Sequence, residues 1–377
     1  GDYYMYDDLN KAGWFNYNSY TSNPIAAMVN SSRGNNKSKN YGLTMVGYLK
    51  VQPIKGLVYK GQVSYKQNSS SYRGYSPAYK LTSTDQKLTN EVTQNMTTGW
   101  DWQIENTLSY TFNIEKHNFD VLVGQSFKKS GFGMGEYLEA TANDLLFSDW
   151  DRAYISNSMA SQPTSAKGYP TGDNALASFF GRINYNLMDK YVFTASVRAD
   201  GSSKFGKNNK WGYFPAFSAA WRLGEEAFIK DLGVFSDLKF RIGYGLAGNN
   251  RIGSYQSLAL MSSVTAANGN GAQAGYASRQ VPNPDLKWEA NKTFNIGMDF
   301  GFLNQRITFS PEFYINRSSN LLLNAKLPNS SGYTSMVINP GETQNTGVDL
   351  TINTANIVSK DFTWNTSVTF SHNKNKV

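Results

Sequence analysis

Two histidines are the residues of this chain best suited to acid–base chemistry. His117 falls in the short segment "EKHN", and His372 follows an alternating apolar segment, so we expect both at strand ends. Neither has a nucleophile elbow or a paired acid beside it in the sequence. We therefore predict no catalytic residue and no cofactor. An enzyme is the alternative, and it would require one of these histidines to be essential.

The segment "DGSSKFGKNN" at 200–209 has the composition of a loop that could hold an ion. It lacks the spaced Asp and Asn ligands of a calcium loop and the Gly-Lys-Ser/Thr of a phosphate loop. The chain has no cysteine, so it has no thiolate metal site and no disulfide. We predict no metal site, and we expect 200–209 to form a flexible hairpin tip in water.

The segment "LLFSDWDRAYISNS" at 145–158 is the candidate ligand-binding surface. Trp150 and Tyr154 offer ring faces that can stack on sugars, while Asp151 and Arg152 can hydrogen-bond to hydroxyl groups. The alternative is a loop that packs against its neighbours or against a partner protein.

Alternating apolar and polar residues dominate the rest of the chain. We find about twelve such segments, each about ten residues long, which is the length that crosses a bilayer as a tilted strand. Short turns such as "QPIKG" and "MDK" separate some of them, whereas 128–177 and 247–287 are long loops. The connection 224–237 is predicted to hold a short helix. The segments begin near residues 43, 57, 102, 119, 179, 191, 217, 238, 294, 307, 348 and 362.

The alternation assigns each side chain to one of two solvents. The apolar set is expected to face lipid, and it includes Ile183, Tyr185, Phe193, Phe217 and Trp221. The opposite set is expected to face a wet lumen, and it includes Arg182, Arg198, Asp200, Arg222 and Arg241. Trp211, Tyr213 and Phe214 are expected in an interfacial aromatic girdle, with Pro215 at a strand start.

Composition supports a membrane barrel. Aromatic residues make up 14% of the chain, charged residues only 17%, and no apolar run approaches the length of a membrane helix, about 18 residues. The net charge of +8 comes from scattered Lys and Arg, which argues against nucleic-acid binding. A soluble β-sandwich would have shorter strands, and a propeller would show a blade repeat. The fold predicted is an all-β, transmembrane antiparallel β-barrel.

Several long stretches resemble one family, the SusC/RagA TonB-linked outer-membrane proteins of Bacteroidetes. They are "SNPIAAM", "SFFGRINYNLMDKYVFTASVRADGSSKFGKNNKWGYFPAFSAAWRLGEEAFIKDLGVFSDLKFRIGYGLAGNNRIGSY", "NPDLKWEANKTFNIGMDFGFLNQRITFSPEFYINRSSNLLL" and "GETQNTGVDLTI". The resemblance implies a plugged, 22-stranded barrel in the cell outer membrane. It also implies energy-dependent import of nutrients, most often oligosaccharides and sometimes peptides, with a SusD-like surface lipoprotein and the TonB complex as partners.

The sequence departs from this family in what it covers. It shows no plug domain and no TonB-box segment, and it has about ten strands fewer than the family's barrels. We therefore expect residues 1–377 to be part of a longer β-barrel domain. In a plugged barrel the four lumen-facing arginines would more often pair with plug carboxylates than with substrate. A passive channel or structural barrel is the alternative function if the full-length protein lacks a plug and a TonB box.

Overall fold

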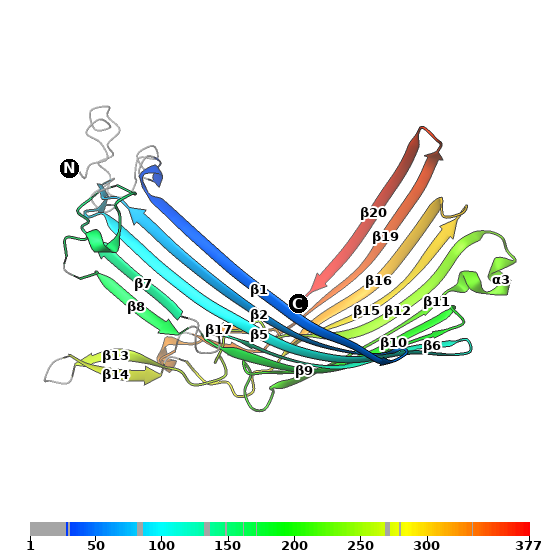
Figure 1. Cartoon of the computed structure of the whole chain (residues 1–377), viewed down its shortest axis with the longest axis horizontal. Coiled ribbons are helices and arrows are strands. Elements are labelled where there is room, and N and C mark those ends of the chain that lie inside the picture. The colour runs from blue at the N-terminus through cyan, green and yellow to red at the C-terminus, as the bar shows by residue number, and fades with distance from the viewer. Residues whose placement is uncertain are drawn as a thin grey trace. The chain divides into compact units, whose positions relative to one another are not determined.

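The computed structural model describes most of the chain as one sheet with attached hairpins (Figure 1). The described residues are 28, 31–80, 86–131, 136–147, 149–160, 162–170, 172–267, 272–278, 280–333 and 335–377. Within these residues no helix is long and apolar enough to cross a membrane.

Twelve strands follow one another across the sheet in the order in which they occur in the sequence, and the pairings described between them are antiparallel. β7 (Glu136–Asn143) pairs with β5, and β8 (Ser165–Pro170) pairs with β7, which makes fourteen strands in the sheet of the described residues. The twelve are β1 (Asn35–Ile54), β2 (Leu57–Ser76), β5 (Glu91–Ile114), β6 (His117–Ser130), β9 (Asn174–Leu187), β10 (Tyr191–Ser202), β11 (Trp211–Trp221), β12 (Phe235–Asn249), β15 (Glu289–Phe302), β16 (Ile307–Ser319), β19 (Glu342–Val358) and β20 (Thr363–Lys376).

The predicted all-β antiparallel fold is therefore confirmed. Each of the twelve predicted segments falls in one of the twelve consecutive strands. The expected length was about ten residues, whereas the observed strands have between 11 residues, in β11, and 24 residues, in β5. The alternation marks only the part of a strand that separates two different solvents, so the polar continuation of a strand is not visible in the sequence.

The chain divides into two compact units. Unit 1 combines 64–102 and 129–173 with the segment up to residue 46, and it includes the β7–β8 pair. Unit 2 combines 47–63 and 103–128 with 174–377, and it includes β9 to β12 and all later strands.

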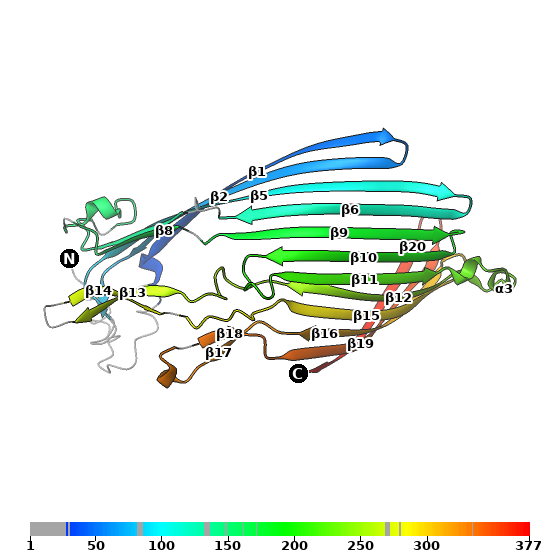
Figure 2. The ribbon, with the colours of Figure 1, turned by 90° about the horizontal axis from the view of Figure 1, so that it is seen from below.

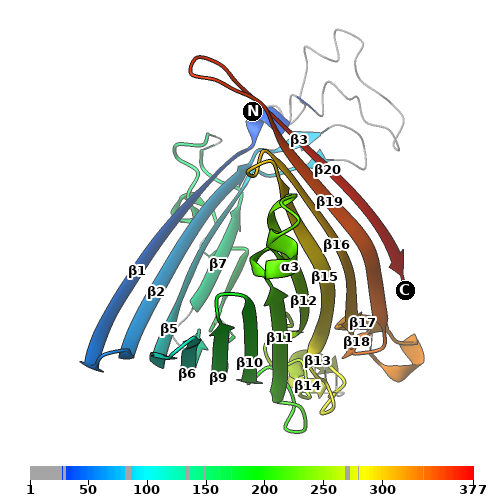
Figure 3. The same ribbon diagram turned by 90° about the vertical axis from the view of Figure 1, so that its right-hand side faces the viewer.

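The apolar face of unit 2 is built by cross-strand partners. Phe193 lies opposite Tyr185 on β9 and opposite Ala219 on β11, and Ala195 lies opposite Phe217. Opposed residues of a ladder share one face of the sheet, so the predicted apolar set shares one face. Rings run along this face from Phe112 through Phe119 to Tyr185 and Phe193, with centroids 5.0, 4.9 and 6.1 Å apart. Figure 3 shows these strands of unit 2 side by side.

The connections at one end of unit 2 are short. Residues 188–190 join β9 to β10, and residues 303–306 join β15 to β16. The predicted short helix is confirmed as α3 (Ala227–Lys230), which follows the 3-10 turn η2 (Leu223–Glu225). Glu226 holds this end together, because it accepts hydrogen bonds from Tyr191, Lys190 and Trp221 at 2.7, 3.0 and 3.1 Å. These bonds, led by that of Tyr191, lower the pKa of Glu226 to about 2.

The connections at the other end of unit 2 carry additional structure. One hairpin is formed by β13 (Met261–Ala267) and β14 (Ala272–Ser278), and another by β17 (Leu323–Lys326) and β18 (Ser335–Ile338), with the 3-10 turn η3 (Asn329–Ser331) between them. Figure 2 shows both hairpins at the end of unit 2 opposite α3. Unit 1 has its own small elements, namely the pair β3 (Tyr79–Lys80) and β4 (Gln86–Lys87) and the 3-10 turn η1 (Ile155–Asn157).

The loop at 200–209 is anchored at Phe205 and Gly206, although Lys207 and Asn208 are exposed, so the prediction of a hairpin tip that lies wholly in water is wrong. Phe205 is 1% exposed and packs with Leu286, Phe214 and Trp288, whose ring centroid lies 5.0 Å from that of Phe205. A Cβ at Gly206 would lie 2.3 Å from the backbone oxygen of Pro284, so only glycine fits this approach. The segment around 284–288, about 80 residues away in sequence, therefore holds the loop.

Two details of β11 also differ from the expectation. Trp211 and Tyr213 are exposed as expected of a girdle, but Phe214 is 8% exposed and belongs to the Phe205 cluster. Consecutive strand residues point to opposite faces, so Phe214 cannot share a face with Tyr213. Pro215 lies inside β11, opposite Val197, rather than at the strand start. Its missing N–H is tolerated because the ladder with β12 begins only at Ala216.

Candidate functional site

The polar face of unit 2 carries four of the five charged residues predicted for the lumen. Ser196 lies opposite Arg182, and Arg198 and Asp200 follow Ser196 at alternate positions of β10. Ala220 lies opposite Arg241, and Arg222 follows Ala220 by two residues. The alternation of the strands therefore places Arg182, Arg198, Asp200 and Arg241 on the face opposite Phe193 and Phe217. Arg222 follows the last residue of β11, so the alternation does not assign its side chain to a face.

Arg241 occupies the centre of a charged cluster on this face. It donates to both oxygens of Asp299 on β15, at 2.8 and 3.1 Å, and to Glu312 on β16, at 3.2 Å. All three side chains are half-buried. Asp299 and Glu312 were not predicted from the sequence. The signal in the sequence was an acidic residue at a polar-face position of each of two neighbouring strands. The register places Asp299 opposite Lys239 and places Gly297 between Arg241 and Glu312, so both carboxylates come within reach of Arg241.

The other three arginines predicted to face the lumen also have acidic partners within the described residues. Arg198 pairs with Asp200 at 2.8 Å, Arg182 with Asp120 at 3.3 Å, and Arg222 with Glu225 at 3.5 Å. The pairs of Arg182 and Arg222 are largely exposed, and each stabilises the protein by about 1 kcal/mol or less. Arg198 is exposed, but its partner Asp200 is buried. The ion pairs orient the charged groups. Contact of these arginines with plug carboxylates stays a prediction.

The two histidines lie in strands. His117 is the first residue of β6, where its Nδ1 is 2.8 Å from the hydroxyl oxygen of Tyr185. His372 lies inside β20, opposite Val348, so its predicted place past a strand end is wrong. The residues His-Asn-Lys-Asn-Lys extend β20 because they pair with β19, which a local pattern does not reveal. Among the described residues, no group of three or more His, Cys, Asp or Glu side chains could hold a metal ion.

The candidate ligand loop in unit 1 packs against the neighbouring strands. Trp150 and Ile155 rest on a buried cluster of Tyr75, Val92, Ala142, Leu145 and Ala153. The guanidinium carbon of Arg73 on β2 lies 3.9 Å from the ring centroid of Trp150 and 4.1 Å from that of Tyr154. Arg73 also donates to the carbonyl oxygen of Ala153, at 3.3 Å. No sequence signal pointed to Arg73, because it is about 80 residues from the loop.

The four residues predicted to bind a ligand do not converge on one point. Arg152 is 2.6 Å from Asp149 and lies over the ring of Phe147. The hydrogen bond from Arg152 is the main cause of a lowered pKa at Asp149. Asp151 is exposed, and Trp150 is partly buried behind Arg73. Their role in ligand binding stays a prediction.

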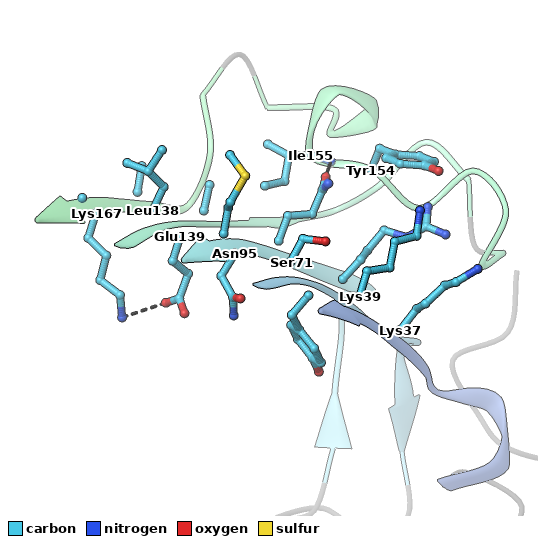
Figure 4. A pocket seen from close by; sticks show the side chains of 16 residues that line it. Lys37, Lys39, Ser71, Asn95, Leu138, Glu139, Tyr154, Ile155 and Lys167 are labelled. Atoms are coloured by element: carbon cyan, nitrogen blue, oxygen red, sulfur yellow. Dashed lines mark hydrogen bonds and ion pairs between the residues drawn. The ribbon is translucent and has the colours of Figure 1, made fainter. Parts of the chain in front are cut away.

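Beside this loop lies an open groove with a volume of about 870 Å³ (Figure 4). Its apolar lining includes Met96, Leu138 and Ile155, and Met96 and Leu138 are cross-strand partners on β5 and β7. Its charged lining is Lys37, Lys39, Arg73, Lys167 and Glu139, and of the four predicted ligand residues it includes Tyr154. Figure 4 shows Tyr154, Lys37 and Lys39 toward one end, and Lys167 with Glu139 toward the other.

The amino-acid sequence and the fold are both similar to those of known proteins. Residues 1–377 match the family described as TonB dependent receptor-like, beta-barrel. The chain is 31% identical to TonB-dependent receptor P39 of Formosa agariphila, over 100% of this chain and 37% of that protein. It is 37% identical to TonB-dependent receptor SusC of Bacteroides thetaiotaomicron, over 73% of this chain and 28% of that protein.

The solved structure of the RagAB peptide transporter shares the fold, with a TM-score of 0.80 and 26% identity over 92% of this chain and 37% of that chain. The chain thus spans about a third of the length of the relatives that it matches. The resemblance to the SusC/RagA proteins is confirmed. The chain belongs to the TonB-dependent receptor β-barrel family of the outer membrane.

Proposed function

We propose that the protein containing this chain imports a nutrient across the outer membrane with energy delivered through TonB. The observation that carries the proposal is the match of the whole chain to the family of TonB-dependent receptor barrels. The sheet agrees with it, because one face is apolar and the other carries charged side chains. Such a sheet separates lipid from a polar passage. The wall ion pairs centred on Arg241 would give that passage a charged lining.

The ligand class that we favour is an oligosaccharide, with a SusD-like surface lipoprotein as the partner that holds it. The 37% identity to SusC supports this choice. A peptide is the second candidate, because the RagAB structure of similar fold is that of a peptide transporter. Trp150, Asp151, Arg152 and Tyr154 of the ligand loop are the proposed contacts.

Uptake by cells that make the full-length protein should collapse when TonB is deleted or the proton gradient is dissipated. It should also weaken when Trp150 and Tyr154 are both replaced by Ala, if each ring contributes about 1 kcal/mol of stacking. The measurement is uptake of labelled oligosaccharides and peptides, with outer-membrane protein levels compared because Trp150 also packs on a buried cluster.

The outcomes separate the remaining alternatives. Uptake that persists without TonB would support a passive channel and contradict our proposal. Uptake that needs TonB but is unchanged in the double variant would keep the importer and exclude this ligand loop. An enzyme would be supported instead if a catalytic activity of the full-length protein were lost in His117→Ala or His372→Ala at normal protein levels.

The orientation of the strands can be tested by labelling intact cells. The turn at 188–190 and the connection 247–287 lie at opposite ends of the strands of unit 2 (Figure 2). We expect 247–287 and 128–177 on the cell surface, and the turns at 52–56 and 188–190 in the periplasm. Epitope tags in the two long connections should be accessible to antibody without permeabilisation. Surface labelling of a tag at Asp189 would invert this orientation.

A further inference from the structure

The groove of unit 1 gathers cations that are not neutralised. Lys37 and Lys39 are alternate residues of β1, so both side chains lie on one face, and Arg73 comes from β2. Among the described residues, none of these three side chains forms an ion pair. Lys167 differs, because Glu139 lies 2.7 Å from its ammonium nitrogen.

Arg73 is held in place without losing its charge. The rings of Trp150 and Tyr154 lie against its guanidinium group and fix the position of that group by cation–π contact. An aromatic ring does not neutralise the cation as a carboxylate would. One donation, to the carbonyl oxygen of Ala153, is present among the described residues. A guanidinium group carries five N–H donors in a planar fork that matches carboxylate and phosphate groups.

The surroundings of these cations strengthen their attraction for an anion. Met96, Leu138 and Ile155 line the same groove with apolar surface. The groove is open, so a ligand whose body covers this apolar surface would itself displace water, and electrostatic attraction is stronger where water is excluded. An anionic group bound here would also relieve the mutual repulsion of Lys37, Lys39 and Arg73.

We propose that this groove is a binding site for a ligand that carries a carboxylate, sulfate or phosphate group next to an apolar or ring-shaped body. Lys37, Lys39 and the fork of Arg73 would bind the anionic group, while Met96, Leu138 and Tyr154 would contact the body. Tyr154 is shared with the ligand loop of the proposed function, but binding to the groove does not require the import reaction, so it can be tested on purified protein. The same chemistry could be supplied by a soluble ligand or by a lipid headgroup, and the experiment distinguishes these two sources.

The experiment measures binding to the full-length protein in a neutral detergent at low salt. The soluble probes are oligogalacturonate, which carries carboxylates, and a neutral galactose oligomer of equal length. The lipid probes are bilayer discs of phosphatidylglycerol and of phosphatidylcholine. We expect an anionic probe to bind more tightly than its neutral counterpart, with an affinity that falls as salt is raised. Preference for oligogalacturonate identifies a soluble ligand, and preference for phosphatidylglycerol identifies a headgroup.

Substitutions that remove single charges test whether the anionic probe binds in the groove. The double variant Lys37→Gln/Lys39→Gln should weaken binding of the anionic probe about tenfold or more, because it removes two hydrogen bonds to a charged group. Glu139→Gln should tighten binding, because it frees Lys167. Lys207→Gln, at an exposed lysine in unit 2, is the control and should change nothing.

Arg73→Lys tests the contribution of the planar guanidinium group to binding of the anionic probe, because this substitution keeps the positive charge and removes the planar set of N–H donors. Lys37 and Lys39 are exposed, so their replacement should not disturb folding. Neutral and anionic probes binding equally well would overturn the proposal. So would anion binding that is unchanged in the double lysine variant.

Discussion

Replacing Phe205 with Ala should open the loop at 200–209 and the segment that covers it. Phe205 is 1% exposed and forms one packed cluster with Leu286, Trp288 and Phe214. Removing a buried phenyl ring from such a cluster costs about 3–5 kcal/mol, because the cavity closes only in part. Amide hydrogen exchange in the full-length protein should therefore accelerate by about a hundredfold or more at 200–209 and 283–288.

Phe228→Ala is the matched control for this substitution. Phe228 lies on α3 and is 60% exposed, so the same chemical change there should leave exchange at 200–209 unaltered. A second variant, Gly206→Ala, tests the same packing from the backbone, because the added Cβ would collide with the oxygen of Pro284. Slow exchange that survives both Phe205→Ala and Gly206→Ala would show that the cluster does not hold the loop.

An Arg at position 193 should destabilise the barrel by about 2–4 kcal/mol if Phe193 lies near the bilayer midplane. Phe193 is exposed on the apolar face, between Tyr185 and Ala219 of the neighbouring strands. A guanidinium group placed there would lose its hydration in the hydrocarbon, where the neighbouring side chains offer no anion. The measurement is the free energy of unfolding of the full-length protein from lipid vesicles, as a function of denaturant.

Ser218→Arg is the better control on the opposite face. Ser218 lies between Thr194 and Gly243, which are uncharged, so the new cation would face the polar side without a like charge opposite it. Ser196 is less suitable, because it lies opposite Arg182. We expect Ser218→Arg to change the stability far less than Phe193→Arg. Equal losses at the two positions would contradict the assignment of the faces.

The strands and their faces were predictable because they depend on a local pattern, the alternation of apolar and polar residues. A strand that separates lipid from water must alternate with a period of two, so Phe193 and Phe217 were assigned to one face, and Arg198 and Arg241 to the other, without a structure. Short turns also leave the two strands that they join little choice of neighbour, as for β9 with β10 and β15 with β16. The same reasoning located α3, where the connection was too long for a hairpin.

Only the tertiary structure decided which residues from distant parts of the chain meet. Phe205 sits in a segment whose glycines, lysines and asparagines are typical of a solvated loop, and its burial depends on Leu286 and Trp288. The guanidinium group of Arg73 lies against the rings of Trp150 and Tyr154, although nothing near Arg73 in the sequence indicates these aromatic partners. Such contacts depend on strand register and loop path. A local sequence pattern records the solvent that each residue faces, whereas these pairings arise from packing between segments about 80 residues apart.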